Sequence, residues 1–278
     1  MKPLILNLAP TGMVPTRAQS PHVPLTPDEV VRDVVACAAL GVSMVHLHAR
    51  DAAGAPTEDA AIYTAMIEGI RARCPDLVIV TTTSGRVVQD VALRARTLQL
   101  EGAAKPDMAS LTLGSMNFSS SASMNAPQTI MRLAQIMGER GIKPELEVFD
   151  LGMVNFAKVL IDKGLIAPPY YFNILLGSPG TAQLNLMHIA AIVADLPAGA
   201  IWSLAGIGRF QLQANGLGVV MADGVRTGLE DNLWRDQART EQADNAQLVG
   251  RVVAQAQALG RPVASCLETR ARLGLARS

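Results

Sequence analysis

The amino-acid sequence predicts a (β/α)8 TIM barrel, which is a closed ring of eight parallel strands with a helix after each strand. The chain has 278 residues, close to the roughly 250 that one such barrel needs. Eight short, almost continuously apolar segments recur along it, and segments with helical patterns separate most of them. No GxGxxG turn follows the first segment, which disfavours the open sheet of a dinucleotide-binding domain.

The predicted strands are those of a sheet covered on both faces, because their apolar residues follow one another with little alternation. They are expected at residues 4–10, 43–51, 77–84, 107–114, 144–150, 170–177, 200–208 and 224–231. Active sites of such barrels lie at the C-terminal ends of the strands. Polar residues late in these segments are therefore the candidates for function.

Helices are expected at residues 29–40, 59–73, 126–140, 152–163, 181–195 and 245–259, where apolar residues recur at helical spacing. The first has the clearest start: Thr26 can cap it, Pro27 suits its first turn, and Glu29 completes a capping box. The stretch 232–278 is longer than one helix needs, and its later part is expected to pack on the barrel or on a neighbouring subunit. We therefore expect one barrel domain over residues 1–278 with a C-terminal helical extension.

The composition excludes several classes of function. The 24 basic and 24 acidic residues give a net charge of zero, so no nucleic-acid surface and no membrane-binding basic face is predicted. No segment approaches the ~20 apolar residues of a membrane span, and the N-terminus reaches Pro and Gly too soon for a signal peptide, so a cytoplasmic protein is expected. Cys37, Cys74 and Cys266 are too widely spaced to predict a disulfide framework or a cysteine zinc site.

The central functional signal is His46-Leu47-His48, near the end of the second predicted strand. Residues i and i+2 of a strand point to the same face, so both imidazoles project together. A pair of neutral imidazoles suits zinc and other first-row divalent metals. Taken alone, the pair can equally be two hydrogen-bonded core histidines.

The last predicted strand adds two acids and a cation. Arg226 and Glu230 share one face of it, and Asp231 begins the following turn. Glu230 would complete a set of two histidines and one carboxylate that leaves positions open for substrate or water. Burying two neighbouring acids costs free energy through like-charge repulsion and desolvation. A metal together with Arg226 would remove that cost. The alternative is a structural ion pair at a helix start, where acids are favourable.

Further polar residues are expected around the same end of the barrel. Thr82 and Ser84 end the third predicted strand and Ser110 lies on the fourth, where hydroxyls can donate hydrogen bonds to a carboxylate or an oxyanion. Glu145 and Glu147 share one face of the fifth predicted strand, and one of them is expected to orient a histidine from behind. Glu147 is also a candidate substrate-binding residue.

Several motifs together resemble the β-keto acid cleavage enzymes. They are APTGMVPTR (9–17), HLHARD (46–51), KPDMASLTLGSMNF (105–118), KPELEVFDLGM (143–153), GIGR (206–209), RTGLEDNL (226–233) and NAQLV (245–249). The resemblance covers essentially the whole chain. It implies a zinc-dependent TIM barrel, with one Zn²⁺ per subunit and usually a homotetramer. It also implies a reaction of a β-keto acid with acetyl-CoA that releases acetoacetate and a new acyl-CoA.

The resemblance implies roles for individual residues as well. His46, His48 and Glu230 match the metal ligands. Asp231 matches the general base that removes a proton from the α-carbon of the keto acid. The resulting enolate would attack the acetyl thioester, and a retro-Claisen step would cleave the adduct. Arg226 matches the residue that supports the base, and we expect it to lower the pKa of Asp231.

Val14 departs from the family pattern. It stands where members that act on an amino-bearing substrate carry an acid, and a valine cannot pair with a cation. We therefore expect a substrate tail that is neutral or apolar. Thr82 and Ser110 match hydroxyls that the family places around the substrate carboxylate and carbonyl.

Three other interpretations stay open. A hydrolase of the amidohydrolase type also uses HxH on a barrel, but it needs further histidines, and only His22 and His188 remain in this chain. His22 could close over the site from the first loop, whereas His188 is expected to pack within a helix. A class II aldolase-type lyase would share the metal–enolate step without CoA. A non-catalytic metal-binding barrel would hold the ion without turnover.

Overall fold

The computed structural model describes residues 1–276 and contains a closed parallel barrel. The barrel strands are β1 (Ile5–Leu8), β2 (Met44–Leu47), β5 (Val78–Thr81), β6 (Met108–Thr112), β9 (Lys143–Val148), β10 (Tyr171–Leu176), β11 (Ile201–Gly206) and β12 (Gly224–Thr227). They are hydrogen-bonded in sequence order, and the ring closes where β12 pairs with β1. The predicted fold is therefore confirmed.

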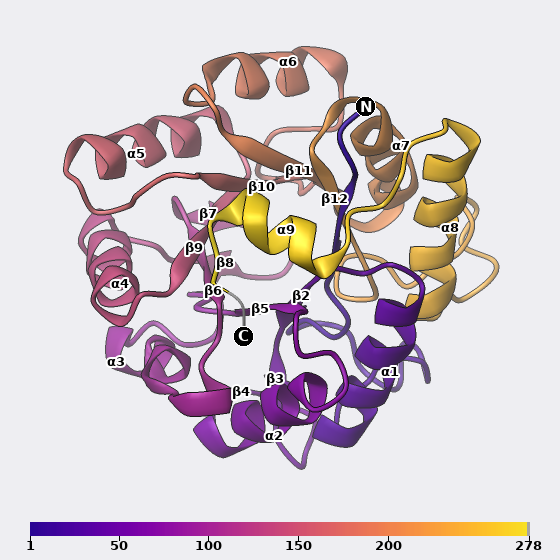
Figure 1. Ribbon diagram of the computed structural model, residues 1–278, viewed down its shortest axis with the longest axis horizontal. Coiled ribbons are helices and arrows are strands. Elements are labelled where there is room, and N and C mark those ends of the chain that lie inside the picture. The colour runs from indigo at the N-terminus through magenta and orange to yellow at the C-terminus, as the bar shows by residue number, and fades with distance from the viewer. Residues whose placement is uncertain (277–278) are drawn as a thin grey trace.

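Helices surround the ring, as Figure 1 shows. They are α1 (Pro27–Ala39), α2 (Ala60–Arg71), α3 (Val91–Arg94), α4 (Pro127–Arg140), α5 (Leu151–Asp162), α6 (Leu186–Asp195), α7 (Gln211–Met221) and α8 (Asn245–Ala258). The predicted capping box of α1 is present. The sequence did not predict α7, because the buried polar residues Gln211 and Asn215 interrupt its apolar pattern. Within residues 1–276, no helix combines the length and the apolar character needed to cross a bilayer.

The barrel interior changes from apolar to polar along its axis. An apolar cluster fills the end where the strands begin: Met44, Val78, Val80, Met108, Tyr171 and Leu273. Further along the strands, the buried carboxylate of Glu145 accepts hydrogen bonds from Asn7 Nδ2 at 2.8 Å and Asn173 Nδ2 at 3.1 Å. Residues on the outer faces of the strands pack in two larger apolar clusters. The polar end of the barrel is thus the end that can carry chemistry.

Helix α9 (Cys266–Leu273) lies across the end of the barrel where the strands begin, as Figure 1 shows. Leu273 is fully buried in the apolar cluster there, and Thr269 Oγ1 donates a hydrogen bond to Ser43 Oγ at 2.9 Å. The predicted C-terminal extension therefore packs on the barrel. It leaves the opposite end of the ring to the loops that follow the strands.

Two short hairpins follow barrel strands at that opposite end. One pairs β3 (Ala49–Arg50) with β4 (Pro56–Thr57), and the other pairs β7 (Met116–Asn117) with β8 (Ala122–Ser123). The predicted strands 43–51 and 224–231 were too long, since β2 ends at Leu47 and β12 at Thr227. At Gly228 the chain turns with a φ of +144°, and an added Cβ would lie only 2.1 Å from the carbonyl oxygen of Ala9. This close approach of two backbones requires glycine.

Candidate active site

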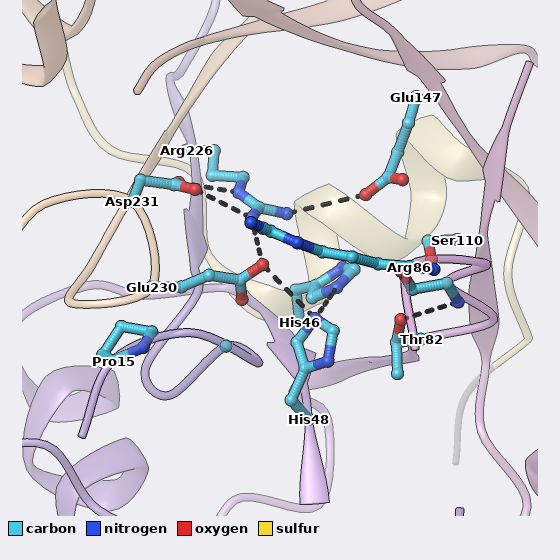
Figure 2. A network of polar contacts seen from close by, with 12 residues as sticks. Pro15, His46, His48, Thr82, Arg86, Ser110, Glu147, Arg226, Glu230 and Asp231 are labelled. Atoms are coloured by element: carbon cyan, nitrogen blue, oxygen red, sulfur yellow. Dashed lines mark hydrogen bonds and ion pairs between the residues drawn. The ribbon is translucent and has the colours of Figure 1, made fainter. Parts of the chain in front are cut away.

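Two imidazoles and a carboxylate converge at the C-terminal end of the barrel, as Figure 2 shows. His46 Nε2 lies 3.2 Å from His48 Nε2, and His48 Nε2 lies 3.3 Å from Glu230 Oε1. Ligand atoms about 2.0–2.1 Å from a tetrahedral zinc ion are about 3.3 Å from one another. The spacing of these three side chains therefore fits one shared cation.

The hydrogen bonds around the three residues point to the same conclusion. His46 Nδ1 lies 2.7 Å from Glu145 Oε2, so Nδ1–H donates to the carboxylate and Nε2 is directed at His48. Two imidazole nitrogens that face one another need a proton or a cation between them. Glu230 Oε2 is buried and has no hydrogen-bond partner among residues 1–276. A cation would satisfy both the nitrogen pair and this oxygen.

The backbone places these ligands differently from what strand alternation predicted. His46 lies on β2, but His48 lies just beyond its end, and Glu230 lies in the turn after β12. The amide of Glu230 donates to the carbonyl oxygen of Ala9 at 3.1 Å. Gly12, at a φ of +66°, packs so closely that an added Cβ would lie 2.4 Å from Glu230 Cγ. The structure brings the three predicted side chains together, but Glu230 lies in a turn and not on a strand as expected.

Arg226, on β12, forms ion pairs with the two acids of the turn that follows, Glu230 and Asp231. Its Nε donates to Asp231 Oδ2 at 2.9 Å, and its Nη2 donates to Asp231 Oδ1 at 3.0 Å and to Glu230 Oε1 at 2.7 Å. Arg226 is only 2% exposed, so this forked contact is shielded from water. Its Nη1 lies 3.8 Å from Glu147 Oε1 and has no hydrogen-bond partner within residues 1–276. This buried nitrogen therefore faces a third carboxylate.

The pKa of Asp231 is raised overall, although Arg226 acts to lower it as expected. Burial of the carboxyl group raises its pKa, and the opposing effect of Arg226 is smaller. A raised pKa makes the carboxylate a stronger base, which is what proton abstraction from carbon needs. Burial also acts to raise the pKa of Glu230, but Arg226 and the two histidines outweigh it and hold that pKa well below its usual range.

The pKa values of the two histidines are shifted in opposite directions. Burial disfavours the charged form of His46, but the Glu145 and Glu230 carboxylates together outweigh it and raise the pKa of His46. Burial lowers the pKa of His48. A proton on His46 can therefore lie between the two Nε2 atoms, in the place where a cation would bind, and metal affinity is expected to fall as the pH falls.

A cavity of about 500 Å³ opens over this cluster. Besides the residues already described, its wall includes the predicted substrate-binding residues Val14, Thr82, Ser84 and Glu147. Ser110 is not part of the wall. Its hydroxyl accepts a hydrogen bond from the amide of Thr83 at 3.3 Å, so the structure places Ser110 behind the segment that carries Thr82.

Several residues of the site were not selected from the sequence. Arg86 lines the cavity together with Thr82 and Ser84, and the spacing i, i+2, i+4 of these residues was the signal that could have found it. Arg50 is buried and donates to the carbonyl oxygens of Gly12, Pro15 and Gly54, which fixes the loop that carries Val14. Contacts from a side chain to distant backbone of this kind leave no sequence pattern.

His22 and His188 do not belong to the site. Both are exposed, and neither lines the cavity. The expectation that His188 packs within a helix was wrong, since it lies in the exposed first turn of α6, where its Nδ1 accepts a hydrogen bond from the amide of Gln183 at 2.8 Å. The further histidine ligands of an amidohydrolase-type centre are therefore missing from the described part of the chain.

The fold and the site together define a barrel enzyme. His46, His48 and Glu230 form a triad able to hold a cation, and it lies beside the buried pair of Arg226 and Asp231. The chain belongs to the beta-keto acid cleavage enzyme family, whose sequence model matches residues 3–275. This confirms the resemblance found in the sequence motifs.

Individual relatives support this family membership. The chain is 36% identical over 276 residues to a 3-keto-5-aminohexanoate cleavage enzyme of Fusobacterium nucleatum, covering 99% of both chains. It is 35% identical over 277 residues to a 3-oxoadipate:acetyl-CoA acetyltransferase of Cupriavidus necator, covering 99% of this chain and 95% of the relative. Among solved structures, apo ObcA shares the fold with a TM-score of 0.81 at 21% identity, over 93% of this chain and 66% of that one.

Proposed function

We propose that this enzyme condenses a β-keto acid with acetyl-CoA and releases acetoacetate and a new acyl-CoA, with one Zn²⁺ per subunit. The observation that carries the proposal is that His46, His48 and Glu230 converge within one cavity beside the Arg226–Asp231 pair. The names of relatives add support, because they include a cleavage enzyme for a keto acid and an acetyl-CoA acetyltransferase.

The triad and the arginine–aspartate pair have separate tasks in this proposal. A cation held by the triad supplies Lewis-acid polarisation of the substrate's keto oxygen. Asp231, which is not a member of the triad, accepts a proton from the adjacent α-carbon. Arg226 holds Asp231 in place through two hydrogen bonds.

The bonds and protons balance across the reaction. The deprotonated α-carbon of the keto acid attacks the acetyl carbonyl, and CoA leaves as a thiolate. The thiolate then attacks the original keto carbon, and the bond between that carbon and the α-carbon breaks. The acyl group leaves as a new thioester, and the proton on Asp231 returns to the α-carbon, which is now part of acetoacetate.

A panel of β-keto acids, assayed with and without acetyl-CoA, tests the proposal. We expect acetoacetate to form only when acetyl-CoA is present, and turnover to be lost after chelation and restored by Zn²⁺. Cleavage without acetyl-CoA would instead indicate an aldolase-type lyase. Zinc binding without turnover of any keto acid would indicate a non-catalytic metal-binding barrel.

The acyl tail of the substrate and the assembly of the enzyme are further parts of the proposal. Val14 lines the cavity and is 45% exposed, which supports a tail without a cationic group. The neutral or apolar tail stays a prediction that the same panel tests. The homotetramer also stays a prediction, and sedimentation equilibrium would test it.

A further inference from the structure

Arg86 presents a charged group to the cavity in a defined orientation. It follows Thr82 and Ser84 on the segment after β5, and these three residues line the cavity, whereas the alternate residues Thr83 and Gly85 do not. Thr83 Oγ1 instead donates to the carbonyl oxygen of Ser110 at 2.6 Å. The segment therefore places two hydroxyls and then a guanidinium along one wall.

Two contacts from the β7–β8 hairpin hold the guanidinium of Arg86. Its Nε donates to Ser121 Oγ at 3.0 Å, and its Cζ lies 4.1 Å from the centroid of the Phe118 ring. Figure 2 shows the side chain of Arg86 directed from its segment toward Glu230 and Arg226. With Nε engaged, the two Nη groups stay available for a forked contact with an anion.

The charge of Arg86 is not paired within the site. It is half-buried, and no carboxylate lies within 4.0 Å of it in residues 1–276. Burial lowers the pKa of Arg86, and the Glu230 carboxylate opposes that effect. A half-buried cation without an acidic partner is costly, and an anionic ligand would offset the cost.

We infer that Arg86 binds a carboxylate of the β-keto acid, an inference that rests on the proposed function. The carboxylate can have two sources: the one next to the α-carbon, which every β-keto acid carries, or a second one at the far end of the acyl tail. The side chain reaches toward the triad and lies in the same cavity. The reacting keto acid must occupy that cavity, so its carboxylate is the anion placed to contact the guanidinium of Arg86.

The test compares wild type with Arg86→Gln on two acids of equal length, 3-ketohexanoate and 3-ketohexanedioate. We expect Arg86→Gln to raise the KM of the keto acid ~10- to 100-fold, with a smaller change in kcat and an unchanged KM for acetyl-CoA. An equal loss for both acids assigns the carboxylate next to the α-carbon. A loss confined to the diacid assigns the second carboxylate and overturns the neutral tail expected from Val14.

Two variants and a binding measurement complete the test. Arg73→Gln removes an equal charge from an exposed residue outside the cavity, and its KM values should match wild type. Arg86→Lys keeps the charge without the fork, and its KM should fall between the other two. Calorimetric titration with the same two acids, without acetyl-CoA, should show weaker binding to Arg86→Gln.

Unchanged binding and unchanged KM of both acids in Arg86→Gln would overturn the inference, as would a loss confined to the KM of acetyl-CoA. Neither result affects the proposed function as long as wild type turns over keto acids. Failure of wild type to turn over any keto acid would contradict the proposed function instead. The calorimetric comparison would then still decide whether Arg86 binds a carboxylate.

Discussion

The orientation of His46 in the triad depends on the carboxylate of Glu145, which contacts Nδ1 of the imidazole. Glu145 is fully buried and accepts hydrogen bonds from Asn7 and Asn173 while it pairs with His46 Nδ1. Burial acts to raise the pKa of Glu145, but His46, Arg226 and the hydrogen bond from Asn7 outweigh it and lower that pKa. The imidazole of His46 is thereby fixed in the orientation that directs Nε2 to the cation position.

Replacing Glu145 with glutamine tests this support. Glu145→Gln removes the negative charge behind His46, and we expect the affinity for Zn²⁺ to fall ~10- to 100-fold. Competition titration against a chromogenic chelator measures the change. Glu139→Gln, on the exposed surface of α4, is the matched control. An affinity that is equal in the two variants would show that Glu145 has only a packing role.

The assignment of Asp231 as the base predicts a separation of turnover from metal binding. Asp231→Asn keeps the shape of the side chain and removes its basicity, so we expect kcat to fall ~10²- to 10⁴-fold. The zinc content per subunit, measured by plasma emission spectrometry, should not change because Asp231 is not a member of the triad. Loss of zinc along with activity would instead place Asp231 among the ligands.

At the scale of elements, the site is assembled by loops that buried arginines hold. Arg94 is 1% exposed and donates to the carbonyl oxygen of Thr83 at 2.8 Å and to Asn125 Oδ1 at 2.7 Å. It thereby joins the segment after β5 to the end of the β7–β8 hairpin. Arg50 does the same for the loop that carries Val14. Rigid loops of this kind keep binding groups in position.

Gly12 lies in the loop that carries Val14, and it packs against Glu230 of the triad. We expect Gly12→Ala to lower the free energy of unfolding by about 1–3 kcal/mol, because φ is positive there. We also expect weaker zinc binding, because the added methyl group must displace the side chain of Glu230. Urea unfolding and a chelator titration measure the two effects.

The control for Gly12 is Gly138→Ala, in α4. An added Cβ meets nothing within 4 Å there, and alanine is favoured over glycine in a helix by about 0.5–1 kcal/mol. This variant should be slightly more stable than wild type and should bind zinc equally well. If Gly12→Ala binds zinc as tightly as Gly138→Ala does, the loop does not position Glu230.

The elements also show what could be predicted from the sequence. Apolar runs predicted the barrel strands, and the HxH spacing predicted that His46 and His48 would lie together. The position of Glu230 could not be derived in the same way, because a turn at Gly228 and a backbone contact with Ala9 place it. Arg86 could have been found from its i, i+4 spacing from Thr82, but the hairpin contacts that orient its guanidinium leave no sequence pattern.

At the scale of the whole molecule, the two ends of the barrel are specialised. Helix α9 covers the apolar end, where the strands begin, and the cavity opens at the polar end, where the strands finish. We expect Leu273→Ala to cost about 2–5 kcal/mol of unfolding free energy, because Leu273 is fully buried. Zinc affinity should not change, since the triad lies at the other end. Leu267→Ala, at a residue that is 42% exposed, should cost far less in the same urea titration.

Stability should also depend on pH through Glu58, which is buried and has an Oε2 without a hydrogen-bond partner in residues 1–276. Burial raises the pKa of Glu58 to about 7. Because the folded-state pKa lies above the ordinary value of 4.5, the folded protein favours the protonated form. The contribution of this group to stability is full below its ordinary pKa and is lost as the pH rises through about 7.

Glu58→Gln should remove this loss. From pH 5 to pH 8.5 we expect wild type to lose on the order of 3 kcal/mol of unfolding free energy that the variant keeps. Urea unfolding at several pH values measures the difference between the two proteins. Parallel stability curves for wild type and variant would contradict a raised pKa of Glu58.

The preset spacing of 3.2 Å between the two facing imidazole nitrogens has a practical consequence for anyone who purifies the protein. Cobalt, nickel and copper ions accept the same ligand types as zinc, and nitrogen and oxygen ligands rank divalent ions mainly by the Irving–Williams order. A pocket that needs no rearrangement has little means of rejecting them. On the proposed function, we expect the element recovered with recombinant protein to follow the supply in the growth medium, and specific activities to become comparable only after demetallation and defined reloading.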